Sequence, residues 1–435
     1  MMRPRIPPAL KHRDFFFLWL GQLISIAGSQ MQVWSLFWHI RTLTHQPIAL
    51  GGIGLARILP VILFSPVAGA VADSYSRRRV LFITQIAAGL VALILGLLTQ
   101  FGHIGLAHIY ALTAIQAVAV AFDGPARQAL IPNLVPARDL PNAFSLTSIA
   151  FQTGAVIGPA LSGIVIVVAG QEAVYYINAV SFLAVIVALV MIGDVPQKRS
   201  AESGGVSRSA IREGMRFIAA RPIILSSMLL DFVATFFASA NTLMPIIARD
   251  VLKVGVVQYG WLSAAQSVGA VLAGLIISQL RVLRRQGPLL LWAVIVFGSG
   301  TVFFGITRSF PVAWFLLALT GAADSVSTII RNTIRQLQTP DHIRGRMTSI
   351  NQIFFQGGPQ LGEIEAGAVA QVFGAPIAVV TGGIGCLAGL GMIVAKWPQL
   401  ISYDAHEPGL AGVAGLTGQK TSRRISSEPA EPREH

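Results

Sequence analysis

Long apolar runs and short polar stretches alternate along the chain from about residue 15 to about residue 396. A helix needs about 20 predominantly apolar residues to cross the hydrocarbon core of a bilayer. Twelve runs are close to that length or exceed it. They lie near 15–37, 48–72, 79–100, 106–122, 142–169, 172–193, 222–247, 256–280, 288–307, 311–334, 346–371 and 375–396. The pattern therefore predicts twelve transmembrane segments.

These segments are expected to be helices, because backbone groups in lipid must be hydrogen-bonded within the spanning structure. Runs this long and this evenly apolar do not fit the alternating strands of a barrel. Composition agrees: 54% of the 435 residues are hydrophobic and 12% are charged, against about 25% charged residues in soluble domains. The single cysteine, Cys386, excludes a disulfide framework and a cysteine-rich metal site. We predict an all-α membrane protein.

The basic residues predict which way the segments face. If the N-terminus is cytoplasmic, 27 of the 32 Lys and Arg residues lie in inside segments and four lie in outside loops. The positive-inside rule then puts both termini in the cytoplasm. The net charge of +13 is explained by this topology, so nucleic acid is not expected as a partner. No small-residue cleavage site follows the first apolar run, and we do not expect a cleaved signal peptide.

A hydrophilic stretch divides the spans into two sets of six. We expect an N-terminal half at 1–193, a cytoplasmic central loop at 194–221, a C-terminal half at 222–396 and a disordered cytoplasmic tail at 397–435. Within the loop, residues 207–220 have the pattern of an amphipathic helix for the inner membrane surface.

The two halves resemble each other at an offset of about 200 residues. Thr147-Ser148-Ile149 recurs as Thr348-Ser349-Ile350, and Gly158-Pro159 recurs as Gly358-Pro359, each in the fifth segment of its half. Chance similarity between apolar sequences is the alternative, but register and topology match together. Parallel six-helix repeats are typical of one large transporter class, in which substrate binds near the midplane between the halves.

The loop after the second segment carries a first motif. Gly69 is followed by Asp73 and then by Arg77, Arg78 and Arg79. Gly69 allows close helix approach, Asp73 can accept charge-assisted hydrogen bonds, and the arginines favour the inner surface. The motif resembles the loop motif of the major facilitator superfamily, although Ser74 and Ser76 depart from its usual basic residue and glycine. The alternative is a loop that determines topology only.

The fifth segment carries a second motif, which comprises Gly154, Gly158, Pro159 and Gly163. Small residues four apart let helices approach closely, and an internal proline frees a carbonyl group. The motif is similar to the antiporter motif of the superfamily, except that Ser162 occupies the position of the motif's penultimate glycine. In that family it marks exporters that exchange a substrate for protons. Helix packing without directional meaning is the alternative.

Two further stretches resemble a bacterial exporter branch of the superfamily that includes enterobactin and macrolide exporters. They are residues 122–132 and residues 340–346. The resemblance implies the major facilitator fold, with two six-helix pseudo-repeats, in the bacterial inner membrane. It also implies proton-coupled export of small amphiphilic compounds of the drug or siderophore type. A proton-coupled importer or a uniporter of a small metabolite is the alternative.

Ionisable residues inside the spans are candidates for function, because each costs at least about 2.5–3.5 kcal/mol at a helix centre. Four carboxylates are candidates for proton coupling: Asp231, Glu363, Glu365 and Asp324. Asp231 ranks first, because its position in the seventh segment is near the midplane, where it would bind a proton or a cationic substrate. A structural hydrogen bond is the alternative. Glu363 and Glu365 differ by about 200° around their helix, so they cannot share one cavity face.

Substrate-binding candidates are the polar residues within the other spans: Arg57, Gln116, Gln152 and Asn178. Arg57 needs a carboxylate partner that the sequence does not identify, or it binds an anionic substrate. The three neutral residues also suit hydrogen bonds between helices. Arg331 and Arg335 are expected to extend toward the cytoplasmic interface or to bind the aspartates of the loops.

Enzymatic function is not expected, since no catalytic constellation, Walker A sequence or metal-ligand cluster is apparent. We expect no cofactor and no metal. The expected partners are a small-molecule substrate, protons and the lipid bilayer, and we expect a monomer.

Overall fold

The computed structural model describes residues 7–193, 208–238, 240–279 and 285–404, and within them it is built from helices. The N-terminal half contains α1 (Arg13–Leu43), α2 (Pro47–Ser74), α3 (Arg77–Gln100), α4 (Leu106–Leu134), α5 (Leu140–Ala169) and α6 (Gln171–Met191). The helices after it are α7 (Arg208–Ala219), α8 (Pro222–Phe237), α9 (Met244–Ile246), α10 (Val256–Gln279), α11 (Gln286–Ile306), α12 (Phe310–Gln338), α13 (Asp341–Phe373) and α14 (Ala375–Lys396).

Ten stretches of the described residues are long and apolar enough to cross a membrane. Two more helices, α1 with 31 residues and α13 with 33, are long enough to span but are not among these ten. Both pack within their own bundles, α1 against α5 and α6, and α13 against α8 and α14. With these two, the described residues form twelve spans, as the hydrophobic pattern predicts.

Two spans differ from their expected form. The seventh was expected as one continuous helix over 222–247. Instead α8 ends at Phe237, a 3-10 turn follows at Ala240–Leu243, and α9 leads into a π-helical turn at Ile247–Val251. Pro245 contributes to this break, because proline cannot donate a backbone hydrogen bond. The fourth span was expected to end near 122, but α4 continues to Leu134 through two internal prolines.

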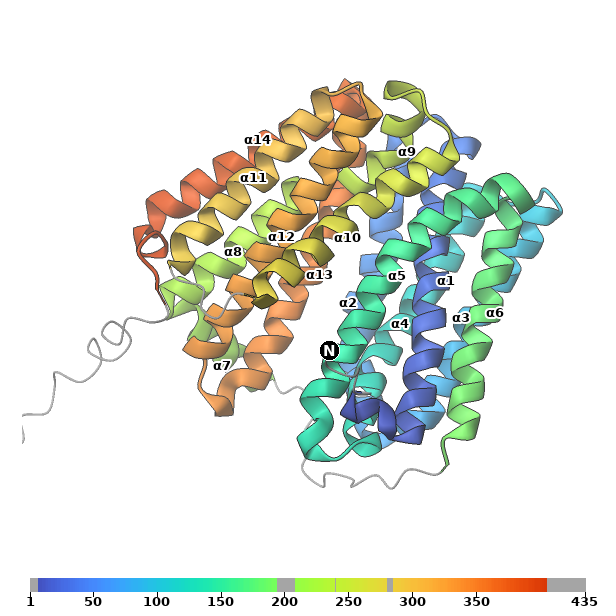
Figure 1. The fold of residues 1–435 in the computed structure, drawn as a ribbon, viewed down its shortest axis with the longest axis horizontal. Helices are drawn as coiled ribbons and strands as arrows, with labels where there is room; N and C mark the ends of the chain where they lie inside the picture. The colour runs from blue at the N-terminus through green and yellow to red at the C-terminus, as the bar shows by residue number, and fades with distance from the viewer. Residues whose placement is uncertain (1–6, 194–207, 239, 280–284, 405–435) are drawn as a thin grey trace, which may run out of the picture.

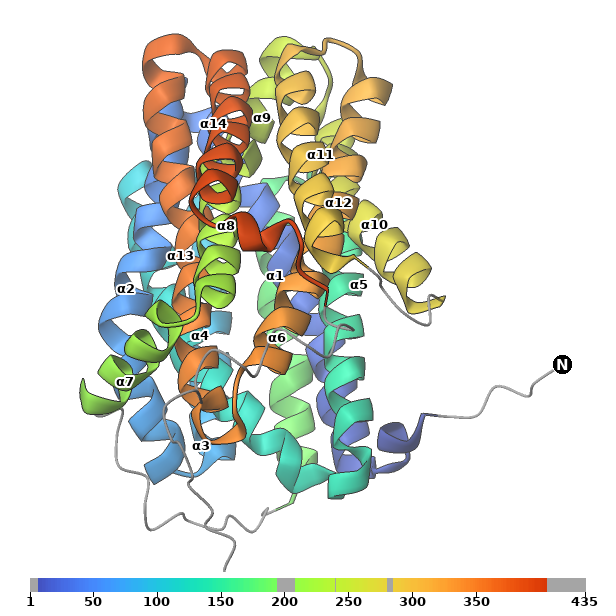
Figure 2. The ribbon, with the colours of Figure 1, turned by 90° about the vertical axis from the view of Figure 1, so that its left-hand side faces the viewer.

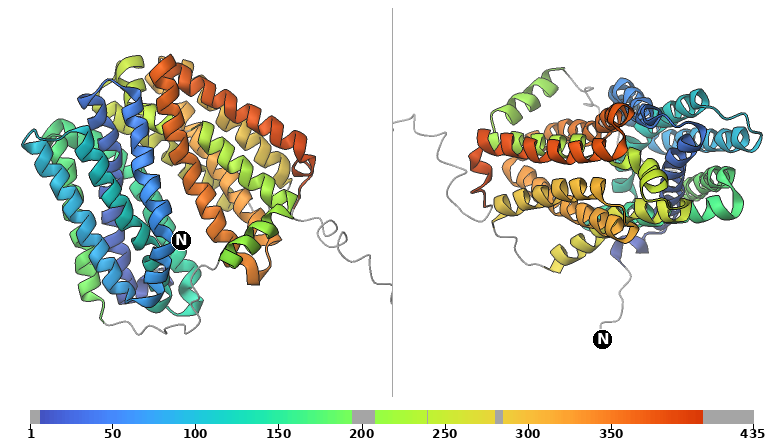
Figure 3. Two further views of the ribbon diagram at one scale, coloured as in Figure 1. Left: turned by 180° about the vertical axis from the view of Figure 1, so that it is seen from behind. Right: turned by 90° about the horizontal axis from the view of Figure 1, so that it is seen from above.

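The spans form two bundles, which lie side by side in Figure 1 and in the left-hand view of Figure 3. Helices α1–α6 pack among themselves, and α8 and α10–α14 do the same. A single glycine turns the chain between the last two helices of each bundle, Gly170 before α6 and Gly374 before α14. Their φ angles of 89° and 87° are unfavourable for residues with a Cβ atom. This shared turn agrees with the internal repeat.

The most extensive contacts between the bundles join two pairs of helices, α2 with α13 and α5 with α10. Glycines allow both approaches. A Cβ atom on Gly367 would lie 2.9 Å from the Cα atom of Gly51, and one on Gly260 would lie 2.6 Å from the carbonyl oxygen of Pro159. A larger residue at these sites would push the bundles apart.

Contacts between the bundles gather toward one end of the molecule, the end that the basic residues predict to be outside. Arg41 of α1 forms an ion pair with Asp250 at 2.7 Å. The Tyr259 hydroxyl group of α10 donates to the Trp34 carbonyl oxygen at 2.8 Å, and the Trp38 ring lies 5.1 Å from the Tyr259 ring. The ribbons of the two bundles diverge toward the opposite end (Figure 1).

Helix α7 occupies the stretch that was expected to be amphipathic. It packs beside α8 and α13 near the diverging end (Figure 2). Ile218 is buried in a cluster with Met347 and Ile350, whereas Arg212 and Arg216 are exposed. The rest of the expected central loop, up to residue 207, lies outside the described residues.

The folded chain extends beyond the expected boundary at residue 396. Residues 398–400 form a 3-10 turn, and Tyr403 is buried. The backbone N–H of Gly287 donates to the Tyr403 carbonyl oxygen at 2.8 Å, which holds this segment against α11. Disorder was therefore the wrong prediction for residues 397–404. The remaining tail lies outside the described residues.

Candidate transport site

A cavity of about 260 Å³ lies where the two bundles meet. Both halves contribute to its wall, from α1, α2 and α5 on one side and from the α8–α9 turn, α10 and α13 on the other. The lining residues are Gln30, Val33, Trp34, Phe37, Arg57, Phe151, Gln152, Ala155, Asn241, Ser263, Gln266, Ser267 and Glu363. Eight of these thirteen residues are polar or charged, and Trp34, Phe37 and Phe151 add aromatic rings.

Arg57 and Glu363 form the charged pair of this cavity. Nη1 of Arg57 lies 3.9 Å from Oε1 of Glu363, and the guanidinium group lies 5.4 Å from the centre of the Phe37 ring. Arg57 belongs to α2 and Glu363 to α13, so the pair bridges the two halves. The structure thus supplies the partner of Arg57 that the sequence did not identify.

Asp231 belongs to a second charged cluster, inside the C-terminal half. Its Oδ1 lies 2.8 Å from Nη2 of Arg331, and both side chains are 2% exposed. Asp324 lies 3.6 Å from the same nitrogen, with its side chain 46% exposed. Arg331 also donates to the hydroxyl groups of Ser327 at 2.6 Å and Thr328 at 2.8 Å. Both carboxylates therefore share one arginine.

The expectation that Arg331 and Arg335 extend toward the interface is wrong. Arg331 is 1% exposed and Arg335 is 4% exposed. Arg331 is held by the carboxylates of α8 and α12, and Arg335 hydrogen-bonds to Asn332. Two carboxylates hold Arg331 inside the bundle, whereas a neutral amide is the partner of Arg335.

Glu365 lies apart from both clusters. It is half-buried on α13 and forms no ion pair with any described residue. Two positions from Glu363, it is directed to another side of the helix, as the helical geometry predicts.

Of the neutral candidates, Gln152 lines the cavity, whereas Gln116 and Asn178 belong to a network inside the N-terminal half. Gln32 of α1 connects them: it donates to Oε1 of Gln116 at 2.8 Å and accepts from Nδ2 of Asn178 at 2.7 Å. This arrangement joins three helices, α1, α4 and α6, and corresponds to the interhelical alternative for these two residues.

Asp123 of α4 is a buried carboxylate that the sequence reasoning used only as part of the stretch 122–132 and did not place inside a span. It pairs with Arg127 one turn on and accepts from the side chains of Gln85 at 2.7 Å and Thr84 at 3.3 Å. Because the fourth span was expected to end near 122, Asp123 was assigned to a loop. The i, i+4 spacing with Arg127 was the available signal.

The arginines of the loop motif fasten α3 to its neighbours. Arg77 donates to the Ala129 carbonyl oxygen of α4 at 2.8 Å, and Arg78 donates to the Leu189 carbonyl oxygen of α6 at 2.6 Å. Ser76, which departs from the usual glycine, caps α3 by accepting from the backbone N–H of Arg79 at 3.4 Å. The side chain of Asp73 lies outside the described residues, as does the environment of Gly69.

The antiporter-type motif of α5 contacts two helices. A Cβ atom on Gly154 or Gly158 would collide with α1, within 2.6 Å of Ile26 and 2.5 Å of Gln30 respectively. Gly163 and Pro159 lie against α10 of the other half, near Val256 and Gly260. The motif therefore contributes both to the packing of the N-terminal bundle and to the contact between the bundles.

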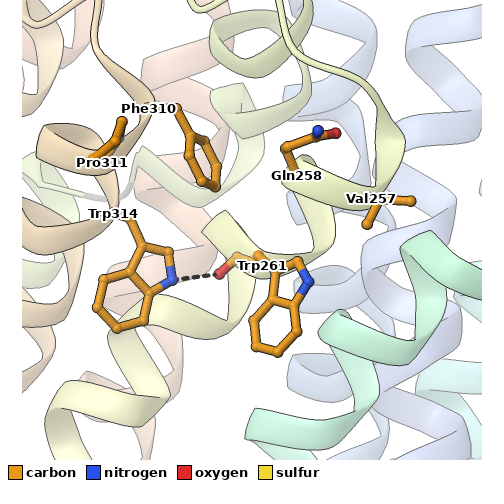
Figure 4. Close-up of a pocket in the computed structure, with 6 residues that line it drawn as sticks. All are labelled: Val257, Gln258, Trp261, Phe310, Pro311 and Trp314. Carbon is orange, nitrogen blue, oxygen red and sulfur yellow. Dashed lines mark hydrogen bonds between the residues drawn. The ribbon is translucent and has the colours of Figure 1, made fainter.

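A second pocket of about 500 Å³ lies at the predicted outer end of α10 and α12 (Figure 4). Its lining is almost wholly apolar: Val257, Gln258, Trp261, Phe310, Pro311 and Trp314. Although it is larger than the central cavity, it contains no charged group and belongs to one half only. We therefore take the central cavity as the candidate site. Among the described residues no cluster of His, Cys, Asp or Glu could hold a metal ion.

The family model for transmembrane secretion effectors matches residues 7–408, nearly the whole chain. The chain belongs to this family of major facilitator transporters. It is a multi-pass membrane transporter, and its relatives and fold are those of transporters, not enzymes.

Curated relatives of the transporter include exporters of siderophores and drugs. A staphyloferrin A transporter of Staphylococcus aureus is 26% identical and is matched over 82% of this chain and 88% of its own. The multidrug efflux pump Tap of Mycolicibacterium fortuitum is 24% identical, and the match covers 91% of this chain and 98% of the pump. The enterobactin exporter EntS of Escherichia coli is 25% identical, over 78% and 81%.

Solved structures share the transporter's fold at low identity. A bacterial homologue of the human lysosomal transporter Spinster, in an inward-facing and occupied conformation, gives a TM-score of 0.71 at 14% identity. It covers 93% of this chain and 100% of its own. A bacterial homologue of the iron transporter ferroportin, in an inward-facing state, gives a TM-score of 0.66 at 15% identity. The match covers 90% of this chain and 99% of the homologue.

Proposed function

We propose that this protein exports small amphiphilic compounds across the bacterial inner membrane by alternating access, in exchange for protons. The observation that carries the proposal is the central cavity, which both halves line and which holds the ion pair between Arg57 and Glu363. The exporters among its relatives and the antiporter-type motif of α5 support the outward direction. With the N-terminus in the cytoplasm, the bundles touch at the outer side, which corresponds to an inward-facing state.

Glu363 is the carboxylate that we propose for proton coupling, ahead of Asp231. Its ionic partner Arg57 lies in the other half, so rocking of the halves separates the pair. Asp231, Asp324 and Arg331 all belong to the C-terminal half, and rigid-body motion leaves their contacts unchanged. A carboxylate that loses a neighbouring arginine takes up a proton more readily, because the positive charge no longer stabilises its ionised form.

The proposed cycle follows from this difference. When the outer side opens, Glu363 loses Arg57, becomes accessible from outside and binds a proton. When the outer side closes again, Arg57 returns, stabilises the ionised carboxylate and expels the proton toward the cytoplasm. Substrate moves outward when the outer side opens, before Glu363 binds the proton. One proton therefore enters the cell for each substrate molecule that leaves it.

A growth screen tests the export proposal in cells. Strains that lack or overproduce the protein are compared across a panel of drugs and siderophores, and the intracellular amount of each compound is measured. We expect at least one compound to accumulate when the gene is deleted and to fall when it is overexpressed. Higher accumulation in the overproducing strain would instead support the importer.

The ion pair between Arg41 and Asp250 is expected to hold the outer side closed. Arg41 is 7% exposed and pairs across the two halves. Replacing Arg41 with Gln should weaken the closed state by about 1 kcal/mol, roughly a fivefold change in population, as for a partly exposed pair. Spin labels are attached at Leu43 and Val372 in a variant that lacks the native Cys386. Pulsed electron paramagnetic resonance should then report a longer distance between these two labels at the outer side.

Two controls accompany this measurement. Arg308→Gln removes an outer arginine that forms no ion pair among the described residues, and it should leave the distances unchanged. Labels at Tyr75 and Leu337, near the opposite end, should move closer in Arg41→Gln. Unchanged outer distances in Arg41→Gln would remove the pair from the gating contact.

A further inference from the structure

Two oxygen atoms in the cavity residues are buried without a hydrogen-bond donor among the described residues. They are Oε2 of Glu363 and Oδ1 of Asn241, one on α13 and one in the turn that interrupts the seventh span. An unsatisfied buried acceptor costs about 1–3 kcal/mol. The carboxylate can turn about its last side-chain bond, so either of its oxygens can meet a donor from the cavity. Both groups thus suit a ligand that supplies N–H donors.

The surroundings of Arg57 resemble a binding site for a cation. Its guanidinium group lies over the Phe37 ring and near the Glu363 carboxylate, and Trp34 and Phe151 complete the aromatic part of the wall. Aromatic faces beside a carboxylate are the usual recognition elements for organic cations. The contact between Arg57 and Glu363 is loose at 3.9 Å, and the Arg57 side chain is 22% exposed, so a ligand can displace it.

Exchange of substrate for protons in opposite directions favours a cationic substrate over an anionic one. This step rests on the proposed export in exchange for protons, which requires that proton and substrate do not bind together. A substrate cation and a proton both need the Glu363 carboxylate, so they exclude each other. A substrate anion would bind Arg57 better once Glu363 is protonated, and the two would then travel in the same direction.

We infer that the central cavity binds compounds with an ammonium or amidinium group on an aromatic or aliphatic body. The cationic group binds Glu363 in place of Arg57, with Asn241 as a second acceptor. The body of the compound packs against Trp34, Phe37 and Phe151. Arg57 is then an internal competitor that occupies the site while it is empty of substrate.

The pH dependence of such binding depends on the charged groups around Glu363. Helix α2 contributes Arg57 at this depth, and the turn at Ala240–Leu243 contributes no charge. Asp231 of α8 is paired with Arg331, α14 carries only Lys396 at its far end, and α7 packs against the first turns of α13. Ionisation of Glu363 should therefore set the pH profile, and cation affinity should rise with pH.

Three fluorescent probes with one dansyl group test the inference: dansylcadaverine, its neutral N-acetyl derivative, and the carboxylate dansylaminohexanoic acid. Their affinities are measured on the purified protein in detergent between pH 5 and 8, where the alkyl ammonium group stays charged. We expect the amine to bind at least tenfold more tightly than the other two, with affinity increasing with pH. Arg57→Gln should strengthen amine binding several-fold, because it removes the competitor. Glu363→Gln should abolish the preference for the amine.

Glu363→Asp keeps the charge and should retain the preference at lower affinity, which separates a charge effect from misfolding. Tightest binding of the carboxylate probe, with loss of that binding in Arg57→Gln, would reveal an anion site and overturn the inference. Equal affinities, or no binding of the amine, would overturn it too. The measurement needs no gradient. If the amine binds as expected but vesicles show no proton-driven transport, the export proposal fails while the cation site stands.

Discussion

Glu363→Gln is expected to abolish transport against a gradient and to leave downhill exchange measurable. Glutamine retains the shape of the side chain in the tight contact with α2, where Gly54 lies against Glu363. It cannot bind and release a proton as Arg57 leaves and returns. The initial rate of proton-driven transport in reconstituted vesicles should fall at least tenfold. Exchange of labelled for unlabelled substrate should persist at substrate concentrations high enough to offset the weaker binding of a cationic substrate.

Glu365→Gln is the matched control, because it makes the same change two positions away on another side of α13. It should transport nearly as well as the wild type. If Glu365→Gln loses proton-driven transport and Glu363→Gln keeps it, coupling belongs to the other face of the helix. If both are active, Asp231→Asn and Asp324→Asn are the next variants to test.

Arg331→Gln is expected to be among the most destabilising substitutions in the chain. It leaves Asp231 buried and unpaired, and breaking a buried ion pair on one side costs about 3–5 kcal/mol. The apparent melting temperature in detergent, measured by loss of the monodisperse peak after heating, should fall by many degrees. Arg138→Gln, which changes an arginine with an 83% exposed side chain, should leave it nearly unchanged.

A double variant tests whether the loss reflects the unpaired charge. Asp231→Asn combined with Arg331→Gln leaves two neutral partners and should recover much of the lost stability. In a double-mutant cycle the two changes should therefore be strongly non-additive. Additive losses would show that Asp231 and Arg331 contribute independently, and the shared-arginine cluster would then have no energetic basis.

The twelve spans could be predicted from the sequence because lipid leaves few alternatives to a long apolar helix. The prediction failed where polar residues act within a span. The fourth span appeared to end before Asp123, yet Asp123 and Arg127 neutralise each other inside α4. The seventh appeared continuous, although Pro245 accompanies a break beside the cavity.

The candidate site was less predictable, because its pairs join distant parts of the chain. Arg57 was recognised as a charge in need of a partner, and Glu363 was recognised as a coupling candidate. Only the packing of α2 against α13 brings them together. Its depth along the helix favoured Asp231 as the coupling residue. Depth alone cannot show that Arg331, on a helix of the same bundle, already neutralises the Asp231 carboxylate.

The central claim is that proton entry drives substrate export, and proteoliposomes with an imposed pH gradient test it most directly. Vesicles with an acidic lumen are given the compound that the growth screen identifies, with protein-free and Glu363→Gln vesicles as controls. Antiport predicts that the compound concentrates in the acidic lumen whichever way the protein is inserted, and that a protonophore abolishes this. Equilibration without concentration, or concentration only when the lumen is alkaline, would contradict the account.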